Sequence, residues 1–214
     1  MGTVTVSAAE DADYLHGKAL ILIEGGNLIP TGVTITERDN EPTTGIIYVD
    51  DDATGSGDGM TWANAYDNLQ DALYMALWDP QVWEIRVAQG VYRPDEGRGI
   101  VPGDRKIAFA LSNGMSLKGG YAGLGAADSN TRDGVLYETI LSGDLNGDDD
   151  GFVNNSENSY HVVSSEDTNE TAVLDGFTIT GGNADGLESH RYFGGGMYNV
   201  DGHPTVIDCK FTGN

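Results

Sequence analysis

The chain has 214 residues, of which 34 are Asp or Glu and 11 are Lys or Arg, so its formal net charge is −23. This charge argues against nucleic acids and anionic membrane surfaces as partners, because both are polyanions. It fits cation binding or simple solubility. The 31 glycines, which follow no collagen period, and the hydrophobic fraction of 39% indicate many tight turns and little helix.

Residues 1–41 alternate polar and apolar side chains in three segments that are separated by polar turns. The alternation predicts strands over residues 3–6, 19–23 and 32–36. Three strands are few for an independent domain, so we expect part of a larger module here. By composition, residues 42–45 form a linker, and a new strand begins at Ile46.

One helix is predicted over residues 67–77, where apolar side chains recur with helical spacing. Its stripe comprises Leu69, Ala72, Leu73, Ala76 and Leu77. Asp67 is expected to be the N-cap, Gln70 completes a capping box, and Pro80 ends the helix. We expect this helix to cover the first of the strands that follow.

Short strands that run into Gly or Asn follow the helix, at residues 84–88, 107–111, 115–117, 139–141 and 160–163. The pattern of residues 173–183 then returns in residues 206–214, with a similar strand at 194–199 between them. Such repetition predicts a solenoid of parallel strands. Because a solenoid needs a cap at each end, we expect the chain to be a piece of a longer molecule.

The repetition also predicts which side chains lie inside. One continuous interior is expected to be lined by Ile85, Val87, Leu117, Ile140, Val162, Phe177, Ile179, Ile207 and Phe211. Asn183, Asn199 and Asn214 follow strands or glycine turns, and we expect them to stack as a ladder of side-chain amides. Cys209 alternates with Ile207 and Phe211, which favours a small buried thiol.

Several segments carry a family resemblance: "IYVDDDATGSGDGMTWANAYDNLQDAL", "EIRVAQGVYRP", "LDGFTITGGNADG", and "GGGMYN" with "PTVIDCKFTGN". From Ile46 onward the chain resembles bacterial surface proteins with polymorphic outer-membrane-protein-type repeats, which have a pectate-lyase-like fold. Residues 1–41 resemble the C-terminal strands of a Calx-β-like or immunoglobulin-like module. The resemblance implies an all-β fold class. It implies the N-terminal portion of a right-handed parallel β-helix over residues 46–214, with one capping helix, preceded by a partial β-sandwich.

An acidic turn is the best candidate for chemistry, and it comprises Asp144, Asn146, Asp148, Asp149 and Asp150. Oxygen atoms at alternate positions around a glycine-containing turn can converge on Ca²⁺, which takes six to eight oxygens at about 2.3–2.6 Å. The match to an EF-hand loop is partial, because Asp149 occupies its glycine position and Asn155 its twelfth, although Glu157 is close. The sequence therefore predicts either a Ca²⁺ loop or an acidic surface turn.

A second acidic loop carries Asp50, Asp51, Asp52 and Asp58. We expect it to be a solvated turn, since three adjacent carboxylates are poorly placed to face one ion.

No residue is assigned to catalysis. Asp175 and Asp208 occupy similar places in two repeats and would suit a glycosidase pair if they stacked, but solvent-facing turns are the favoured interpretation. Arg191 and Lys210 lie in no motif typical of a lyase base, and the four histidines show no metal-ligand spacing.

Two functions remain open. The first is a secreted or cell-surface structural or adhesive protein of bacterial type, stabilised by Ca²⁺ and contacting extracellular polysaccharide or other surface components. The alternative is the N-terminal part of a polysaccharide-active lyase or glycoside hydrolase. The pectate-lyase-like fold hosts both classes, so the resemblance does not choose between them.

Overall fold

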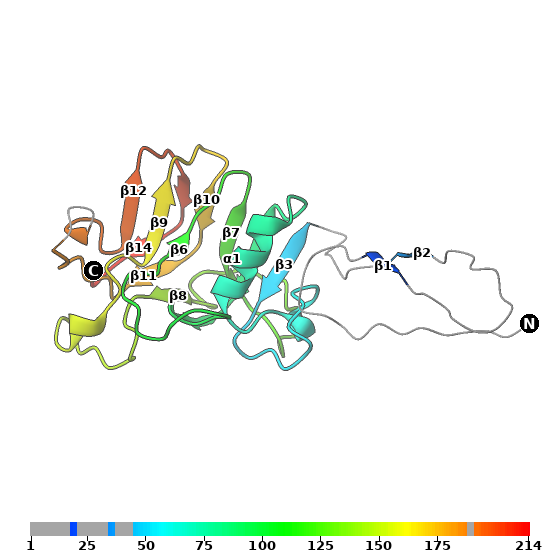
Figure 1. Cartoon of the computed structure of the whole chain (residues 1–214). Coiled ribbons are helices and arrows are strands. Elements are labelled where there is room, and N and C mark those ends of the chain that lie inside the picture. The colour runs from blue at the N-terminus through cyan, green and yellow to red at the C-terminus, as the bar shows by residue number, and fades with distance from the viewer. Residues whose placement is uncertain (1–17, 21–33, 37–44, 188–190) are drawn as a thin grey trace, which may run out of the picture. The chain divides into compact units, whose positions relative to one another are not determined.

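The computed structural model describes residues 18–20, 34–36, 45–187 and 191–214, and the chain divides into two compact units, Met1–Glu41 and Pro42–Asn214 (Figure 1). In the first unit, β1 (Lys18–Leu20) pairs antiparallel with β2 (Thr34–Thr36). Strand β2 falls within the strand predicted over residues 32–36, and β1 overlaps the strand predicted over residues 19–23. The strand predicted over residues 3–6 lies outside the described residues. The assignment of this unit to a β-sandwich module, and of residues 42–45 to a linker, stays a prediction.

The second unit contains three β-sheets. The five-stranded sheet has the order β13 (Thr205–Ile207), β10 (Val173–Asp175), β7 (Ser116–Tyr121), β4 (Glu84–Ala88), β3 (Ile46–Val49). The four-stranded sheet has the order β14 (Lys210–Phe211), β11 (Thr178–Thr180), β8 (Thr139–Ser142), β5 (Gly90–Tyr92). The three-stranded sheet has the order β12 (Met197–Val200), β9 (Val163–Glu166), β6 (Phe109–Ala110). The helices are η1 (Trp62–Asn64), α1 (Leu69–Trp78) and η2 (Asn155–Glu157).

All strand pairs in these three sheets are parallel, as the repetition predicts. Apolar side chains follow the register across neighbouring strands. In the five-stranded sheet, Ile47 lies opposite Ile85, Ile85 opposite Leu117, and Leu117 opposite Leu174. All four are fully buried. Residues that lie far apart along the chain therefore form one continuous apolar row.

The expected fold class needs correction. We expected a right-handed parallel β-helix with one capping helix, preceded by a partial β-sandwich. The described residues instead form three separate parallel sheets of five, four and three strands, a two-stranded antiparallel pair and one α-helix, and no β-helix or solenoid is identified among them. Register partners such as Ile46 and Glu84, or Ser116 and Val173, are separated by unequal lengths of chain, so no coil of constant length repeats.

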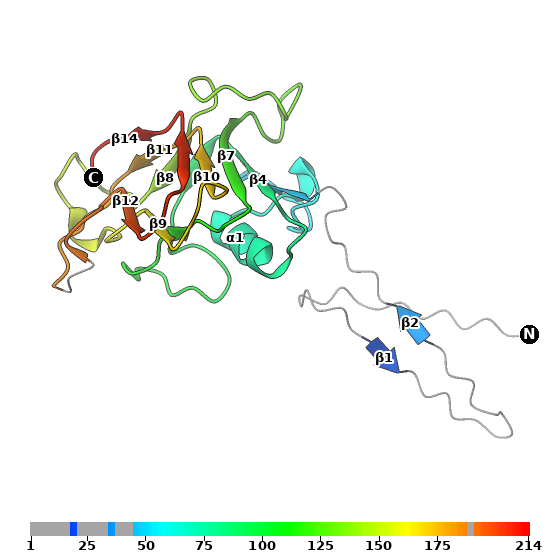
Figure 2. The same cartoon turned by 90° about the horizontal axis from the view of Figure 1, so that it is seen from above.

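Helix α1 forms where the apolar stripe predicts it, but its cap differs. The N-cap is Asn68, whose side-chain oxygen accepts a hydrogen bond from the Asp71 backbone N–H at 2.9 Å. Gln70 does not complete a capping box, because its amide donates to the carbonyls of Pro94 and Ala108 instead. The helix lies against β3, β4 and β6 (Figures 1 and 2).

The core confirms six of the nine predicted interior residues. Ile85, Val87, Leu117, Val162, Phe177 and Ile179 are all buried. Ile140 is only half-buried, because its neighbour Leu141 faces the interior in its place. Ile207 and Phe211 are 41% and 45% exposed, since they lie on β13 and β14 at the end of their sheets.

The predicted asparagine ladder is not formed. Asn183 donates to the Asn155 carbonyl, Asn199 to the Gly202 carbonyl, and Asn214 to the Ile179 carbonyl. Each amide thus donates to a backbone carbonyl rather than to the side chain of another asparagine. Among the described helices, none is long and apolar enough to cross a membrane.

Candidate metal centre

The acidic turn of residues 144–150 lies directly after β8. Its start is fixed by Gly143, whose N–H donates to the Thr180 carbonyl at 2.8 Å. A Cβ atom at Gly143 would lie only 2.4 Å from the Gly181 carbonyl oxygen, so the close approach of the two backbones requires glycine. Arg93 holds the next residue by donating from Nε to the Asp144 carbonyl at 2.8 Å.

Asp144 organises the turn through its carboxylate. Its Oδ1 accepts from the backbone N–H groups of Gly147 at 2.7 Å and Asp148 at 3.2 Å, and its Oδ2 accepts from that of Asp149 at 3.2 Å. Gly147 has φ of 71°, which allows the sharp left-handed turn. The chain therefore folds around the Asp144 side chain.

Three carboxylates converge beside this turn. Asp144, Asp148 and Glu157 each place one oxygen within 4.8 Å of the other two. Glu157 is the last residue of the short helix η2, which brings its side chain back beside the turn. Burial, followed by the charges of Asp148, Asp149 and Asp144, raises the pKa of Glu157. The convergence of three carboxylates gathers negative charge, which a divalent cation would neutralise.

Three buried acceptor oxygens belong to residues 149–158, the same segment that carries Glu157. Oδ1 of Asp149, Oε1 of Glu157 and Oδ1 of Asn158 are all buried without a hydrogen-bond donor in the described part of the chain. Asn158 is only 1% exposed, and its Nδ2 donates to Asp149 Oδ2 at 2.7 Å. A buried polar atom without a partner is costly, and unpaired acceptors of this kind are satisfied by water or by a cation.

The five predicted ligands therefore separate into two groups. Asp144 and Asp148 belong to the converging group, and Asp149 is linked to it by its backbone N–H, which donates to Asp144 Oδ2. Asn146 is exposed in the turn, and Asp150 is exposed and pairs its backbone with Val153. The sequence pointed to Glu157 only by its proximity to position twelve, and it contained no signal for Asn158.

The second acidic loop matches its prediction in part, because Asp51 and Asp52 are exposed, as in a solvated turn, whereas Asp50 is not. Asp50 is 2% exposed rather than solvated, and its carboxylate accepts from the backbone N–H groups of Asp52 and Leu124. Burial raises the pKa of Asp50, and burial with the neighbouring charges raises that of Asp51. Asp50, Asp51 and Asp52 also bring oxygens within 4.8 Å of one another, contrary to our expectation. Unlike the acidic turn, this cluster contains no buried oxygen that lacks a donor in the described part of the chain, and the hydrogen bonds of Asp50 join its own loop to that of Leu124.

The possible carboxylate pair does not stack in register. Asp175 lies opposite Ile207 rather than Asp208. Asp175 is also mostly buried, and it pairs with Arg132 at 2.7 Å, so it is not a solvent-facing turn residue. Asp208 is exposed, with φ of 46°.

Comparison of the chain with protein-family models, with curated proteins and with solved structures found no match. The functional argument therefore depends on the residues themselves.

Proposed function

We propose that the Pro42–Asn214 unit is a Ca²⁺-stabilised structural or adhesive unit of a secreted or cell-surface protein. Asp144, Asp148 and Glu157 would hold the ion, with Asp149 and Asn158 beside them. The observation that carries the proposal is the set of donorless buried oxygens next to three converging carboxylates. One cation can interact with several acceptor oxygens that have no hydrogen-bond donor, whereas a single protein donor could satisfy only one of them.

Ca²⁺ fits this arrangement better than Mg²⁺. Ca²⁺ accepts six to eight oxygens in flexible geometry, whereas Mg²⁺ demands a near-ideal octahedron at about 2.0–2.1 Å. The available groups are carboxylates and an amide oxygen from an irregular turn, which suits the more adaptable ion. No nitrogen or sulfur ligand lies in the converging group, so a transition metal is disfavoured.

The extracellular setting is supported by one feature of the sequence and by the affinity expected of the proposed ion. Residues 46–214 resemble bacterial surface proteins with polymorphic outer-membrane-protein-type repeats. Extracellular modules also bind Ca²⁺ with Kd of about 10⁻⁴–10⁻³ M, so they are loaded where calcium is millimolar. Extracellular polysaccharide or other surface components are the partners that such a role implies.

The proposal is tested by thermal melts of the full chain in Ca²⁺ and in EGTA, together with calorimetric titration. Ligand binding to the folded state alone adds about 2.7 kcal/mol at a hundredfold excess over Kd, which is about 10 mM Ca²⁺ for a Kd of about 10⁻⁴ M, so this concentration raises the Tm. The combined variant Asp148→Asn with Glu157→Gln removes most of that rise. Asp144 is left intact because it organises the turn.

A control variant with the same change in net charge tests whether the effect is specific to this site. Glu166→Gln with Glu170→Gln removes two exposed carboxylates elsewhere in the chain, and it retains the full Ca²⁺ response. Identical wild-type melts in Ca²⁺ and EGTA would contradict the proposal. An equal response to Mg²⁺ would show general charge screening instead of a Ca²⁺ site.

A further inference from the structure

The short helix η2, which carries Glu157 to the acidic turn, is also bonded to a segment that lies much later in the chain. Asn183 donates from Nδ2 to the Asn155 carbonyl at 2.8 Å. The backbone N–H of Asn183 donates to the Ser159 carbonyl, also at 2.8 Å. Because Asn155 and Ser159 lie on either side of Glu157 in the sequence, the backbone around this candidate ligand is fixed by residue 183.

Arg105 joins the same two parts of the chain. Its Nε donates to the carbonyl of Asn158, the residue directly after η2, at 2.5 Å. Its Nη2 donates to the Asn183 carbonyl at 3.3 Å and to Asp185 Oδ1 at 2.6 Å. One side chain therefore links the end of η2 to two residues of the distant segment.

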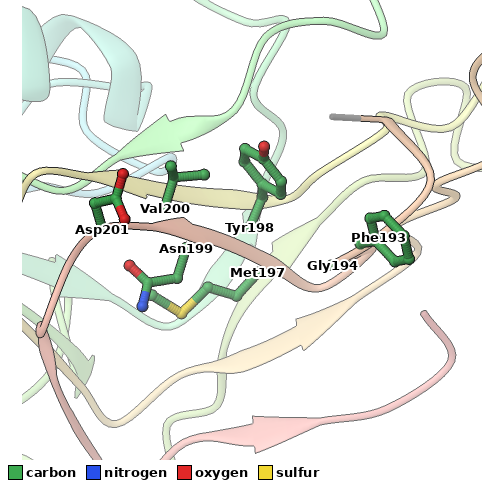
Figure 3. A pocket seen from close by; sticks show the side chains of 7 residues that line it. All are labelled: Phe193, Gly194, Met197, Tyr198, Asn199, Val200 and Asp201. Atoms are coloured by element: carbon green, nitrogen blue, oxygen red, sulfur yellow. The ribbon is translucent and has the colours of Figure 1, made fainter. Parts of the chain in front are cut away.

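This segment is connected to the surface beside β12. The Gly186 N–H donates to the Arg191 carbonyl at 3.1 Å. The guanidinium groups of Arg105 and Arg191 both lie over the ring of Tyr160, at 4.3 and 5.1 Å from its centre. Phe193 follows and stands at one end of a hollow of about 540 Å³ (Figure 3). A change in how the segment is held would therefore reach the wall of this hollow.

The forces on Glu157 depend on whether a cation is bound. Without an ion, the carboxylate oxygens of Asp144, Asp148 and Glu157, which lie within 4.8 Å of one another, repel. Oε1 of Glu157 is buried without a donor in the described part of the chain, so no protein hydrogen bond offsets the repulsion at that atom. A bound cation attracts all three carboxylates instead. It thereby holds Glu157, and with it the carbonyls of Asn155 and Asn158, where they meet their donors.

We propose that Ca²⁺ at the acidic turn controls the docking of residues 183–186 onto η2. With the ion bound, η2 is fixed and the segment keeps its bonds to Asn155, Ser159 and Arg105. Without the ion, Glu157 is repelled, η2 shifts, and the segment is released. This control rests on the proposed Ca²⁺ function and adds its regulation, since the segment is docked only where calcium is abundant. By linkage, the groups that dock the segment also raise the affinity for Ca²⁺.

Hydrogen exchange of the full chain, followed by mass spectrometry in Ca²⁺ and in EGTA, measures the docking. The backbone amides of Asn183, Asp185 and Gly186 are all hydrogen-bonded, so their exchange reports local opening. We expect Ca²⁺ to slow exchange in residues 183–187 by about fivefold or more, the lower end of typical coupling between two sites. Residues 96–100, a mostly exposed loop that does not contact η2, are the internal control and should not change.

Calorimetric titration of variants with Ca²⁺ tests the reverse direction. Asn183→Ala removes the amide that donates to Asn155, and it should weaken Ca²⁺ binding about threefold, the effect of one hydrogen bond made only in the docked state. Asn199→Ala is the matched control. It also removes one side-chain amide that donates to a backbone carbonyl, that of Gly202, and it should bind Ca²⁺ as the wild type does.

A second pair of variants uses surface charges, so that folding is not at risk. Asp185→Asn weakens the ion pair with Arg105 at a side chain that is 50% exposed, and it should also weaken Ca²⁺ binding. Asp201→Asn removes one exposed carboxylate elsewhere and makes the same change in net charge. Its Kd for Ca²⁺ should stay at the wild-type value.

Circular dichroism confirms that each variant is folded. Ca²⁺ binding by the wild type with unchanged exchange in residues 183–187, or with the same Kd in each variant and its control, would overturn the coupling and leave the Ca²⁺ site standing. Slower exchange in the control loop as well would also overturn it, because the ion would then stabilise the whole unit alike. Absence of Ca²⁺ binding by the wild type would overturn the proposed function and this coupling together.

Discussion

Leu174 and Val206 occupy one register position on the neighbouring strands β10 and β13, yet Leu174 is fully buried whereas Val206 is 42% exposed. The two residues belong to the same apolar row of the five-stranded sheet. Their difference arises because β10 has a strand on both sides, while β13 is the last strand of the sheet. The place of a strand in its sheet, rather than the residue type, therefore decides how much each side chain contributes to stability.

Substitution of these two residues by Ala should lower the free energy of unfolding by different amounts. Leu174→Ala is expected to lower the free energy of unfolding by about 2–5 kcal/mol, through lost burial and a residual cavity. Val206→Ala is expected to cost less than ~1 kcal/mol, because the site is open to solvent. Urea denaturation followed by tryptophan fluorescence measures both, since all three tryptophans lie in the second unit. Equal losses would show that the end of the sheet is covered in solution.

Among the charged residues of the five-stranded sheet, Glu84 should cause the largest loss of stability when it is substituted. It is 2% exposed, and it accepts from Arg86 Nε at 2.6 Å and from Lys118 Nζ. Glu84→Gln leaves two cations without their partner, so we expect a loss toward the lower end of about 3–5 kcal/mol at neutral pH. Glu96→Gln, at a residue that pairs with Arg93 at the surface, is the control and should change stability by less than ~1 kcal/mol. A Glu84→Gln loss no larger than the control would contradict this role.

The interaction of Glu84 with Arg86 and Lys118 also predicts how stability depends on pH. Burial alone would raise the pKa of Glu84, but hydrogen bonds and charges from Lys118 and Arg86 more than offset it and hold the pKa below its ordinary 4.5. A carboxyl with a lowered folded pKa contributes stability above the unfolded pKa and loses it as the pH falls through the folded pKa. The gap between wild type and Glu84→Gln should therefore be constant near neutrality and shrink below about pH 4.5. A gap that persists in acid would exclude Glu84 as the titrating group.

Asn158→Asp tests the polar atoms around the acidic turn. The new carboxylate adds charge beside Asp149, to which Asn158 now donates at 2.7 Å. In EGTA the variant should melt at a lower temperature than the wild type, because like charges repel. In millimolar Ca²⁺ the ion neutralises the added charge, so the rise in Tm between the two conditions should exceed that of the wild type. A smaller rise would place Asn158 away from the cation.

Cys209 should react slowly with thiol reagents in the folded chain. Its Sγ donates to the Leu174 carbonyl at 3.6 Å, it packs against the core, and burial raises its pKa. Because the thiolate is the reactive form, labelling near pH 8 should be slow and should accelerate in urea. Fast labelling of the native chain would mean that the end of the sheet opens readily.

The candidate site could be predicted only in part. Asp144 and Asp148 were accessible to sequence reasoning, because a glycine turn brings alternate side chains of a short segment together. Glu157 and Asn158 enter through η2, and their approach depends on the path of residues 150–156. Asp150 is adjacent in sequence but belongs to a backbone pair with Val153 instead. The spacing of residues along the sequence does not predict that the chain comes back to the acidic turn at Glu157 and Asn158.

Local chemistry determined the strand segments, the turns and the helix, because alternation, glycine and helical spacing act within a few residues. Asn68 caps the helix through local bonds to Asp71, whereas tertiary packing draws Gln70 to the carbonyls of Pro94 and Ala108. Only the tertiary structure decided that the parallel strands form three separate sheets, that Asp50 and Glu84 are buried, and that β12, β13 and β14 each end their sheets. These features depend on contacts between residues far apart in the chain, where no local pattern specifies the partner.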